Sequence, residues 1–307
     1  MLTGHRIPDD VRDRCPVCAE PLPNAVADIS PLYCRCSRCH VVFRRFFRRV
    51  PAEDWDSQYF SDDLVLRYYD RRRSAFKKIV SLMDTRVPER GKWLDIGCGT
   101  GVLLAIVRER GWQAHGIEQS GRCVEIIRST LRGAQITLGS VPEKLEGFSG
   151  YTVVSLVDVL RCLAEPGKVL SLLRNVLAPG GWVLVRELNA DAHSERRRRA
   201  VELDRPRFST FSQVFSPRAL AIALILCGFY NVTSFPSPLF IETGGGERRH
   251  MKGFSDRLNR ITKSLAEPVF HIVHRLSGGR FYLGRNLIVL AQNPMVGTVD
   301  AGSAGTK

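Results

Sequence analysis

The chain has 307 residues, 44% of them hydrophobic, which is enough to bury the core of one large domain beside a small module and excludes disorder throughout. Its formal net charge is +14, and residues 248–285 hold nine basic and two acidic side chains, so an anionic partner is expected near that segment. The longest strongly apolar run, 219–229, is far shorter than the roughly 20 residues that cross a bilayer. The first ten residues lack the apolar segment of a secretory signal, so a cytoplasmic protein is expected.

Two CxxC pairs, Cys15/Cys18 and Cys36/Cys39, lie 17 residues apart near the start of the chain. This spacing is typical of the two knuckles of a zinc ribbon, in which four thiolates surround one ion tetrahedrally. Four protein ligands leave no open position for water, so we predict a structural zinc in a module over 1–50. Cys34 is the spare cysteine. The alternatives are free thiols without metal, or His40 in place of one thiolate.

The remaining chain predicts a helical linker and then an α/β domain. Residues 55–82 mix charged and apolar side chains without Pro or Gly, which favours helices over 51–90. From 91 to 294 short apolar segments alternate with amphipathic ones, as in βαβ units with a parallel sheet. The strands are predicted at 93–96, 113–117, 135–138, 152–156, 182–187, 230–235 and 287–291, and the helices at 102–109, 121–131, 166–177 and 217–227.

Two further segments lie outside this pattern. Residues 237–285 form a basic insertion with apolar residues at helical spacing, which predicts a lid over the active site; contact with an anionic membrane surface or simple packing are the alternatives. Gly, Ser, Ala and Thr dominate residues 295–307, which are expected to be disordered.

A glycine-rich loop follows the first predicted strand of the α/β domain. The segment from Asp95 to Gly101 leads directly into a helix, where glycines let a ligand approach backbone N–H groups. Glu118, 23 residues after Asp95, ends the next strand and can hold both hydroxyls of a ribose. The glycines are spaced GxGxG, whereas a pyrophosphate binder needs GxGxxG.

The segment LDIGCGTG resembles motif I of class I methyltransferases, and GIEQS, YTVVSLVDVL and LAPGGWVLV are similar to their later motifs over roughly residues 90–235. The resemblance implies a three-layer Rossmann-like α/β sheet that binds S-adenosylmethionine. It also implies that the loop meets the methionine end of the cofactor, that Glu118 meets the ribose, and that the residues after the third strand border the adenine. The implied cofactor residues are Asp95, Gly97, Cys98, Gly99, Gly101, Glu118, Gln119, Ser140, Val141 and Leu156.

Together with the cysteine module, these motifs resemble bacterial ribbon-bearing methyltransferases that modify sugars, polysaccharides or other small molecules. Such relatives commonly have Gly in place of His40, and Glu-His in place of Arg161-Cys162, so the usual histidine base is absent. An oxygen or carbon acceptor needs a base. The candidates near the ends of the fourth and fifth strands are Asp158, Glu187 and His193.

The sequence therefore predicts a methyltransferase that methylates oxygen or carbon of a small-molecule or glycan acceptor, with a lipid-linked glycan as one form of it. Two alternatives are kept. Arginines interleaved with phenylalanines at 43–50, and the run at 195–199, are typical of nucleic-acid surfaces and favour an RNA methyltransferase. The absent histidine favours a binding protein that has lost catalysis. Phe208, Phe211 and Phe215 are predicted to pack in the core or to line the acceptor pocket.

Overall fold

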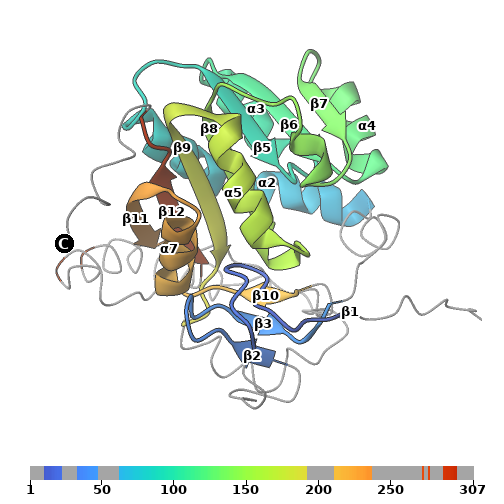
Figure 1. The fold of residues 1–307 in the computed structure, drawn as a ribbon. Helices are drawn as coiled ribbons and strands as arrows, with labels where there is room; N and C mark the ends of the chain where they lie inside the picture. Colours follow the sequence, from blue (N-terminus) through green and yellow to red (C-terminus); the bar gives the residue numbers. More distant parts are fainter. Residues whose placement is uncertain are drawn as a thin grey trace, which may run out of the picture.

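The computed structural model describes residues 10–22, 33–47, 62–191, 211–236 and 286–295, and the single positions 272 and 276. Its main feature is a seven-stranded sheet with the order β11-β12-β9-β8-β5-β6-β7 (Figure 1). The strands are β5 (Lys92–Ile96), β6 (Gln113–Glu118), β7 (Gln135–Leu138), β8 (Tyr151–Val157), β9 (Leu177–Leu188), β11 (Tyr230–Pro236) and β12 (Asn286–Gln292). The first five are parallel to one another, whereas β12 is antiparallel to both of its neighbours.

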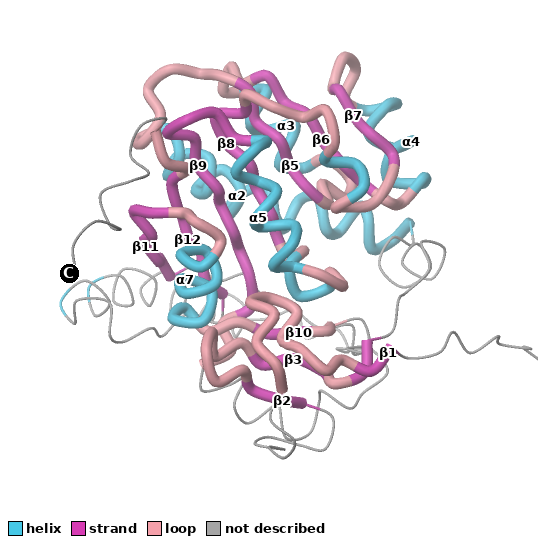
Figure 2. The backbone as a smooth tube through the Cα atoms, in the orientation of Figure 1, coloured by secondary structure: helices cyan, strands magenta, loops and turns pink. Residues whose placement is uncertain are grey.

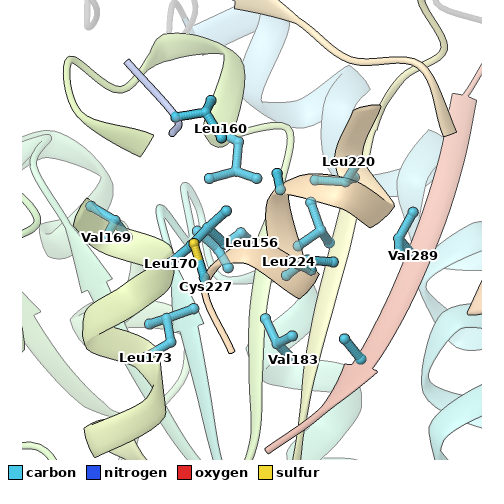
Figure 3. Close-up of a cluster of buried hydrophobic side chains, with 14 of the residues drawn as sticks. Leu156, Leu160, Val169, Leu170, Leu173, Val183, Leu220, Leu224, Cys227 and Val289 are labelled. Atoms are coloured by element: carbon cyan, nitrogen blue, oxygen red, sulfur yellow. The ribbon is translucent and has the colours of Figure 1, made fainter. Parts of the chain in front are cut away.

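Helices cover both faces of this sheet, as Figure 2 shows. They are α2 (Asp62–Asp84), α3 (Val102–Glu109), α4 (Gly121–Thr130), α5 (Pro166–Val176) and α7 (Pro217–Leu226). One buried cluster joins α2 and α3 to one face, and a second joins α5 and α7 to the other. In Figure 3, Leu170 and Leu173 of α5 face Leu220 and Leu224 of α7 above the strands. The predicted three-layer α/β fold is therefore confirmed.

Local sequence explains where the helices begin. Ser120 and Ser216 stand just before α4 and α7, and each hydroxyl accepts a hydrogen bond from the backbone N–H three residues later, at 3.0 and 3.1 Å. These side chains satisfy N–H groups that have no partner inside a helix. A proline opens both α5 and α7, at a position where its missing N–H costs nothing.

The cysteine module lies beneath the carboxyl ends of the parallel strands (Figure 1). It contains β1 (Asp10–Val11), β2 (Tyr33–Arg35), β3 (Val42–Arg44) and β4 (Phe46–Phe47), and β2 pairs with β3 in antiparallel orientation. A short strand from the second half of the chain, β10 (Gln213–Val214), adds to β3 on its other side. The module is therefore continuous with the large domain through a shared sheet.

Several predictions lie outside the described residues. These are His193, Phe208, the arginine run at 195–199, most of the basic insertion at 237–285 and nearly all of the tail at 295–307. In the described part of the chain, no helix is both long enough and apolar enough to pass through a bilayer.

Candidate functional site

The strand order predicts a ligand crevice at the ends of β5 and β8. From β5 the chain continues to β6 and β7 on one side of the sheet, whereas from β8 it continues to β9 on the other side. In open α/β sheets, ligands bind outside the carboxyl ends of the strands at such a switch point. Both the glycine-rich loop after β5 and Asp158 after β8 lie at this edge.

The glycine loop has a backbone that only glycine adopts easily. Gly97 and Gly101 have φ values of +67° and +78°. A Cβ atom at Gly97 would lie 2.5 Å from Cγ2 of Val159, so the loop packs closely against the segment that follows β8. The hydroxyl of Thr100 is buried and has no hydrogen-bond partner among the described residues. A polar atom of this kind fits a loop that receives a polar ligand.

Glu118 joins the end of β6 to this loop. One of its carboxylate oxygens accepts a hydrogen bond from Gly99 N–H at 2.8 Å, and the other accepts one from Ser120 N–H at 2.9 Å. The residue is 6% exposed. The carboxylate is thus held rigidly against the glycine loop.

Asp95 lies below the loop near the end of β5. Its carboxylate accepts a 2.6 Å hydrogen bond from Ser155 Oγ, which in turn accepts one from Trp93 Nε1 at 2.8 Å. Burial raises the pKa of Asp95 to about 7; the hydrogen bond from Ser155 lowers it and the charge of Glu118 raises it. A cationic ligand at this position would favour the ionised form.

The other predicted cofactor residues fall into two groups. Gln119 and Ser140 come together at the ends of β6 and β7, where the Ser140 hydroxyl donates to Gln119 Oε1 at 3.3 Å, and Val141 is partly buried beside them. Cys98 and Leu156 point into the core instead, with exposures of 8% and 0%. Leu156 lies between the sheet and α5 in Figure 3, and it is the last residue but one of β8.

Asp158 is the centre of an ion cluster. It follows β8 in a left-handed conformation, with φ of +64°, and its N–H donates to Arg186 O at 2.8 Å. Its carboxylate accepts hydrogen bonds from Arg72 at 2.9 Å and Arg161 at 2.8 Å, and a further close one from Arg186. Burial alone would raise the pKa of Asp158, but the three guanidinium groups hold it well below its usual range.

Glu187 on β9 extends the cluster. It accepts hydrogen bonds from the Arg161 side chain at 3.0 Å and from the Arg161 N–H at 3.3 Å, and it is 1% exposed. Burial raises the pKa of Glu187 to about 7, against the opposing effect of the Arg161 charge. The structure thus brings two of the three predicted bases together through one arginine.

The four paired cysteines also converge. The sulfurs of Cys15, Cys18, Cys36 and Cys39 all lie within 4.8 Å of one another. Four thiolates about 2.3 Å from a central zinc would have sulfurs roughly 3.8 Å apart, so the group fits that ion. His40, which follows the last cysteine, has φ of +60°, a conformation that glycine adopts more easily. Cys34 lies on β2, outside the group.

Backbone hydrogen bonds connect the cysteine module, through β3, to the loop that follows Asp158. Ser212 N–H donates to Arg161 O and Arg44 N–H donates to Ser212 O, both at 2.8 Å. The Arg161 guanidinium also lies 4.7 Å from the centre of the Phe211 ring. Phe215 is fully buried. Of the predicted phenylalanines, Phe215 therefore belongs to the core, and Phe211 borders the ion cluster.

Sequence reasoning missed Arg72, Arg186 and Thr100. Arg72 comes from α2, 86 residues before Asp158, and Arg186 lies within an apolar strand segment. Neither position carries a local pattern that points to Asp158. Thr100 could have been identified, because it lies inside the glycine motif.

Comparison with known proteins identifies the family and the fold. The sequence profile of a methyltransferase domain matches residues 67–234. Ubiquinone biosynthesis O-methyltransferases from Thiobacillus denitrificans and Caulobacter sp. are 30% and 31% identical over 145 and 155 residues, which is 43% and 47% of this chain. These matches span 62% and 61% of the relatives' own lengths. An S-adenosylmethionine-dependent methyltransferase structure from Thermotoga maritima has a TM-score of 0.51 at 17% identity, over 78% of this chain and 99% of its own, and shows the same fold.

Proposed function

Because the chain belongs to the methyltransferase domain family of class I, S-adenosylmethionine-dependent enzymes, we propose that it transfers a methyl group to a hydroxyl of a small-molecule or glycan acceptor. The observation that carries this proposal is the Glu118 carboxylate, held 2.8 Å from Gly99 N–H over the glycine loop. The O-methyltransferase names of the curated relatives support oxygen as the acceptor atom.

The described residues fit the cofactor. S-adenosylmethionine, when bound, supplies a methyl group on a positively charged sulfur. Glu118 would hold the ribose hydroxyls, and Gly97, Gly99 and Gly101, all with positive φ, give the loop the backbone conformation that would turn it towards the methionine end. The unsatisfied Thr100 hydroxyl can hydrogen-bond to it, and Asp95 contributes a negative charge nearby. Gln119, Ser140 and Val141 would border the adenine. Cys98 and Leu156 would contribute through their backbone.

The chain's main task in the reaction is alignment. A methyl group moves by in-line displacement, so holding the acceptor oxygen near the methyl carbon and excluding water supply much of the rate enhancement. S-adenosylmethionine would supply the methyl group for the acceptor oxygen, and the hydroxyl proton would pass to a base, for which His193 is the candidate. The crevice between the glycine loop and the Asp158 cluster is the place for that acceptor.

We assign Asp158 and Glu187 positioning roles and not the role of base. Three arginines keep Asp158 ionised, and a carboxylate stabilised in that way takes up a proton poorly. Glu187 has a suitable pKa of about 7, but it is 1% exposed and hydrogen-bonded to Arg161. His193 remains the predicted base.

The four-cysteine group is proposed to hold one structural zinc through Cys15, Cys18, Cys36 and Cys39. The ion would fold a module too small to fold by itself. Because this module shares a sheet with β10 and packs beside α5, it would support the acceptor side of the crevice. This packing favours a structural role for the cysteine module over a role as a separate RNA-binding module.

A transfer assay tests the proposed function. The full chain is incubated with methyl-labelled S-adenosylmethionine and a panel of phenols, sugars and nucleotide sugars, with bulk RNA as the rival acceptor. Label in a small-molecule ether that disappears with Glu118→Ala supports the proposal. Label only in RNA, or transfer unaffected by Glu118→Ala, would overturn it.

A further inference from the structure

A hollow in the surface lies at the opposite ends of the strands from the predicted cofactor crevice. It has a volume of about 340 Å³, and its lining includes Lys92, His115, Thr137, Phe148, Ser149 and Tyr151. Sites for small molecules usually have volumes of roughly 300–1,000 Å³. Lys92 is the first residue of β5, whereas the glycine loop follows the last residue, so about 13 Å of strand separates the two.

The hollow is open because a short connection joins β7 to β8. Side chains alternate between the two faces of a strand, and a Cβ atom at Gly116 would lie 2.8 Å from Leu104 of α3. His115, the preceding residue, therefore faces the other side of the sheet, where α5 and α7 pack. The connection from β7 to β8 is described throughout, and its one helical element is a 3₁₀ turn, Glu143–Leu145. Polar side chains at the start of β6 and β7 are thus left partly exposed on that side.

The polar lining of the hollow favours an anion. Lys92, Thr137 and Ser149 offer hydrogen-bond donors, and the described residues that line the hollow include no carboxylate. The Lys92 ammonium lies 5.8 Å from the centre of the Tyr151 ring, and it forms no ion pair with a described carboxylate. Burial, and next the charge of Lys92, lower the pKa of His115, so its ring is neutral at pH 7. Lys92 is therefore a cation without an acidic partner, and such a group attracts anions.

Aromatic rings form a fixed part of the lining. The rings of Phe148 and Tyr151 are stacked, with 5.8 Å between their centres and 29° between their planes. The ring of His115 meets that of Tyr151 edge-on at 5.3 Å, and its Nδ1 is hydrogen-bonded to the Tyr151 hydroxyl. Tyr151 is 3% exposed, so these contacts hold the three rings in place. Phe148 is half-buried and offers a surface on which the planar ring of a ligand can stack.

We propose that this hollow is a second ligand site, which binds a small aromatic compound carrying an anionic group, a carboxylate or a phosphate. Lys92 would hold the anionic group, Thr137 and Ser149 would donate further hydrogen bonds, and Phe148 would stack on the ring. The site is separate from the crevice, so the inference goes beyond methyl transfer and does not depend on it. A charge-assisted hydrogen bond of this kind is worth roughly tenfold to a hundredfold in affinity.

Matched probes test the proposal by NMR titration of the full chain, with S-adenosylhomocysteine present to fill the crevice. One pair is benzoate and benzamide; the other is phenyl phosphate and phenol. The ring signal of His115, identified by its absence in His115→Gln, reports on the hollow. We expect the charged member of one pair to shift this signal and to bind at least tenfold more tightly than its neutral partner, and which pair does so identifies carboxylate or phosphate. Equal affinities within both pairs, or a His115 signal that neither charged probe shifts, would overturn the proposal.

Variants separate recognition in the hollow from general attraction to a basic chain. Lys92 is exposed, so Lys92→Gln should fold normally and lose the preference for the charged probe, and Lys92→Arg should retain it. Lys168→Gln removes the same charge from an exposed ion pair with Glu165 and should leave the preference unchanged. Phe148→Leu should weaken the binding of both members of the pair, because it removes the stacking surface. A preference that survives Lys92→Gln, or that Lys168→Gln abolishes equally, would show that the hollow is not the site.

Discussion

The backbone N–H of Gly167, in the first turn of α5, donates a hydrogen bond to the carbonyl oxygen of Pro16 over 3.1 Å. Pro16 lies inside the first CxxC pair, so the cysteine module is joined directly to the helix that follows the Asp158 loop. A Cβ atom at Gly167 would lie 1.9 Å from the carbonyl oxygen of Val17. Only glycine permits so close an approach.

Gly167→Ala should therefore separate the module from α5. Overpacking of this kind costs about 1–3 kcal/mol, which is more than alanine gains in helix propensity. Thermal unfolding should show a lower midpoint for the variant. Gly121→Ala is the control, because it is also in the first turn of a helix and its Cβ would meet nothing within 4 Å. An equal effect of both substitutions would argue against the described contact.

Metal content tests the cysteine group. We expect about one zinc per chain in protein purified without added metal, and a loss of that zinc with Cys36→Ser. Cys34→Ser should retain the metal, because Cys34 lies outside the group of four sulfurs. Zinc that persists in Cys36→Ser, or is lost in Cys34→Ser, would show that the ligands have been assigned wrongly.

The fold could be predicted from sequence to within one or two residues at most strand ends, because the apolar segments and the breakers between them are local signals. β9 is the exception. It begins at Leu177, five residues before the predicted start. Leu177 pairs with Tyr151 of β8, and the register then shifts before the regular pairing begins. The first residues of β9 include Pro and two Gly, which do not suggest a strand.

The candidate site was only half predictable. Glu118 and the glycine loop lie within a motif, so their meeting at the strand ends follows from the order of the strands. Arg72 reaches Asp158 from a helix 86 residues earlier, and β10 pairs with β3 about 170 residues away. Contacts of this kind depend on the tertiary arrangement and leave no periodic signal in the chain.

The pKa of Asp95 predicts how cofactor affinity depends on pH. Since burial raises that pKa to about 7, a cationic ligand would bind most tightly once Asp95 is ionised. The affinity for S-adenosylmethionine should rise by roughly tenfold between pH 6 and pH 8. Asp95→Asn should bind weakly at both values. A wild-type affinity that falls over this interval would contradict the assignment of Asp95.

The raised pKa of Asp95 also predicts how the free energy of unfolding of the ligand-free protein depends on pH. Between the unfolded pKa of Asp95, about 3.9, and the folded value of about 7, the folded state binds more protons. The free energy of unfolding should therefore decrease as pH rises through this window, and Glu187 acts in the same direction. Asp95→Asn should show a shallower decrease in denaturant titrations at pH 5 and pH 7; an unchanged slope would show that Asp95 is not the group responsible.

Calorimetric titration with S-adenosylmethionine, with NAD as the matched control, tests the central claim most directly. Glu118 is hydrogen-bonded to Gly99 N–H at 2.8 Å and is assigned to the ribose, so wild-type protein should bind S-adenosylmethionine alone, and Glu118→Ala should lose that binding. Absence of binding to the wild-type chain, tighter binding of NAD, or an affinity unchanged by Glu118→Ala would contradict the account.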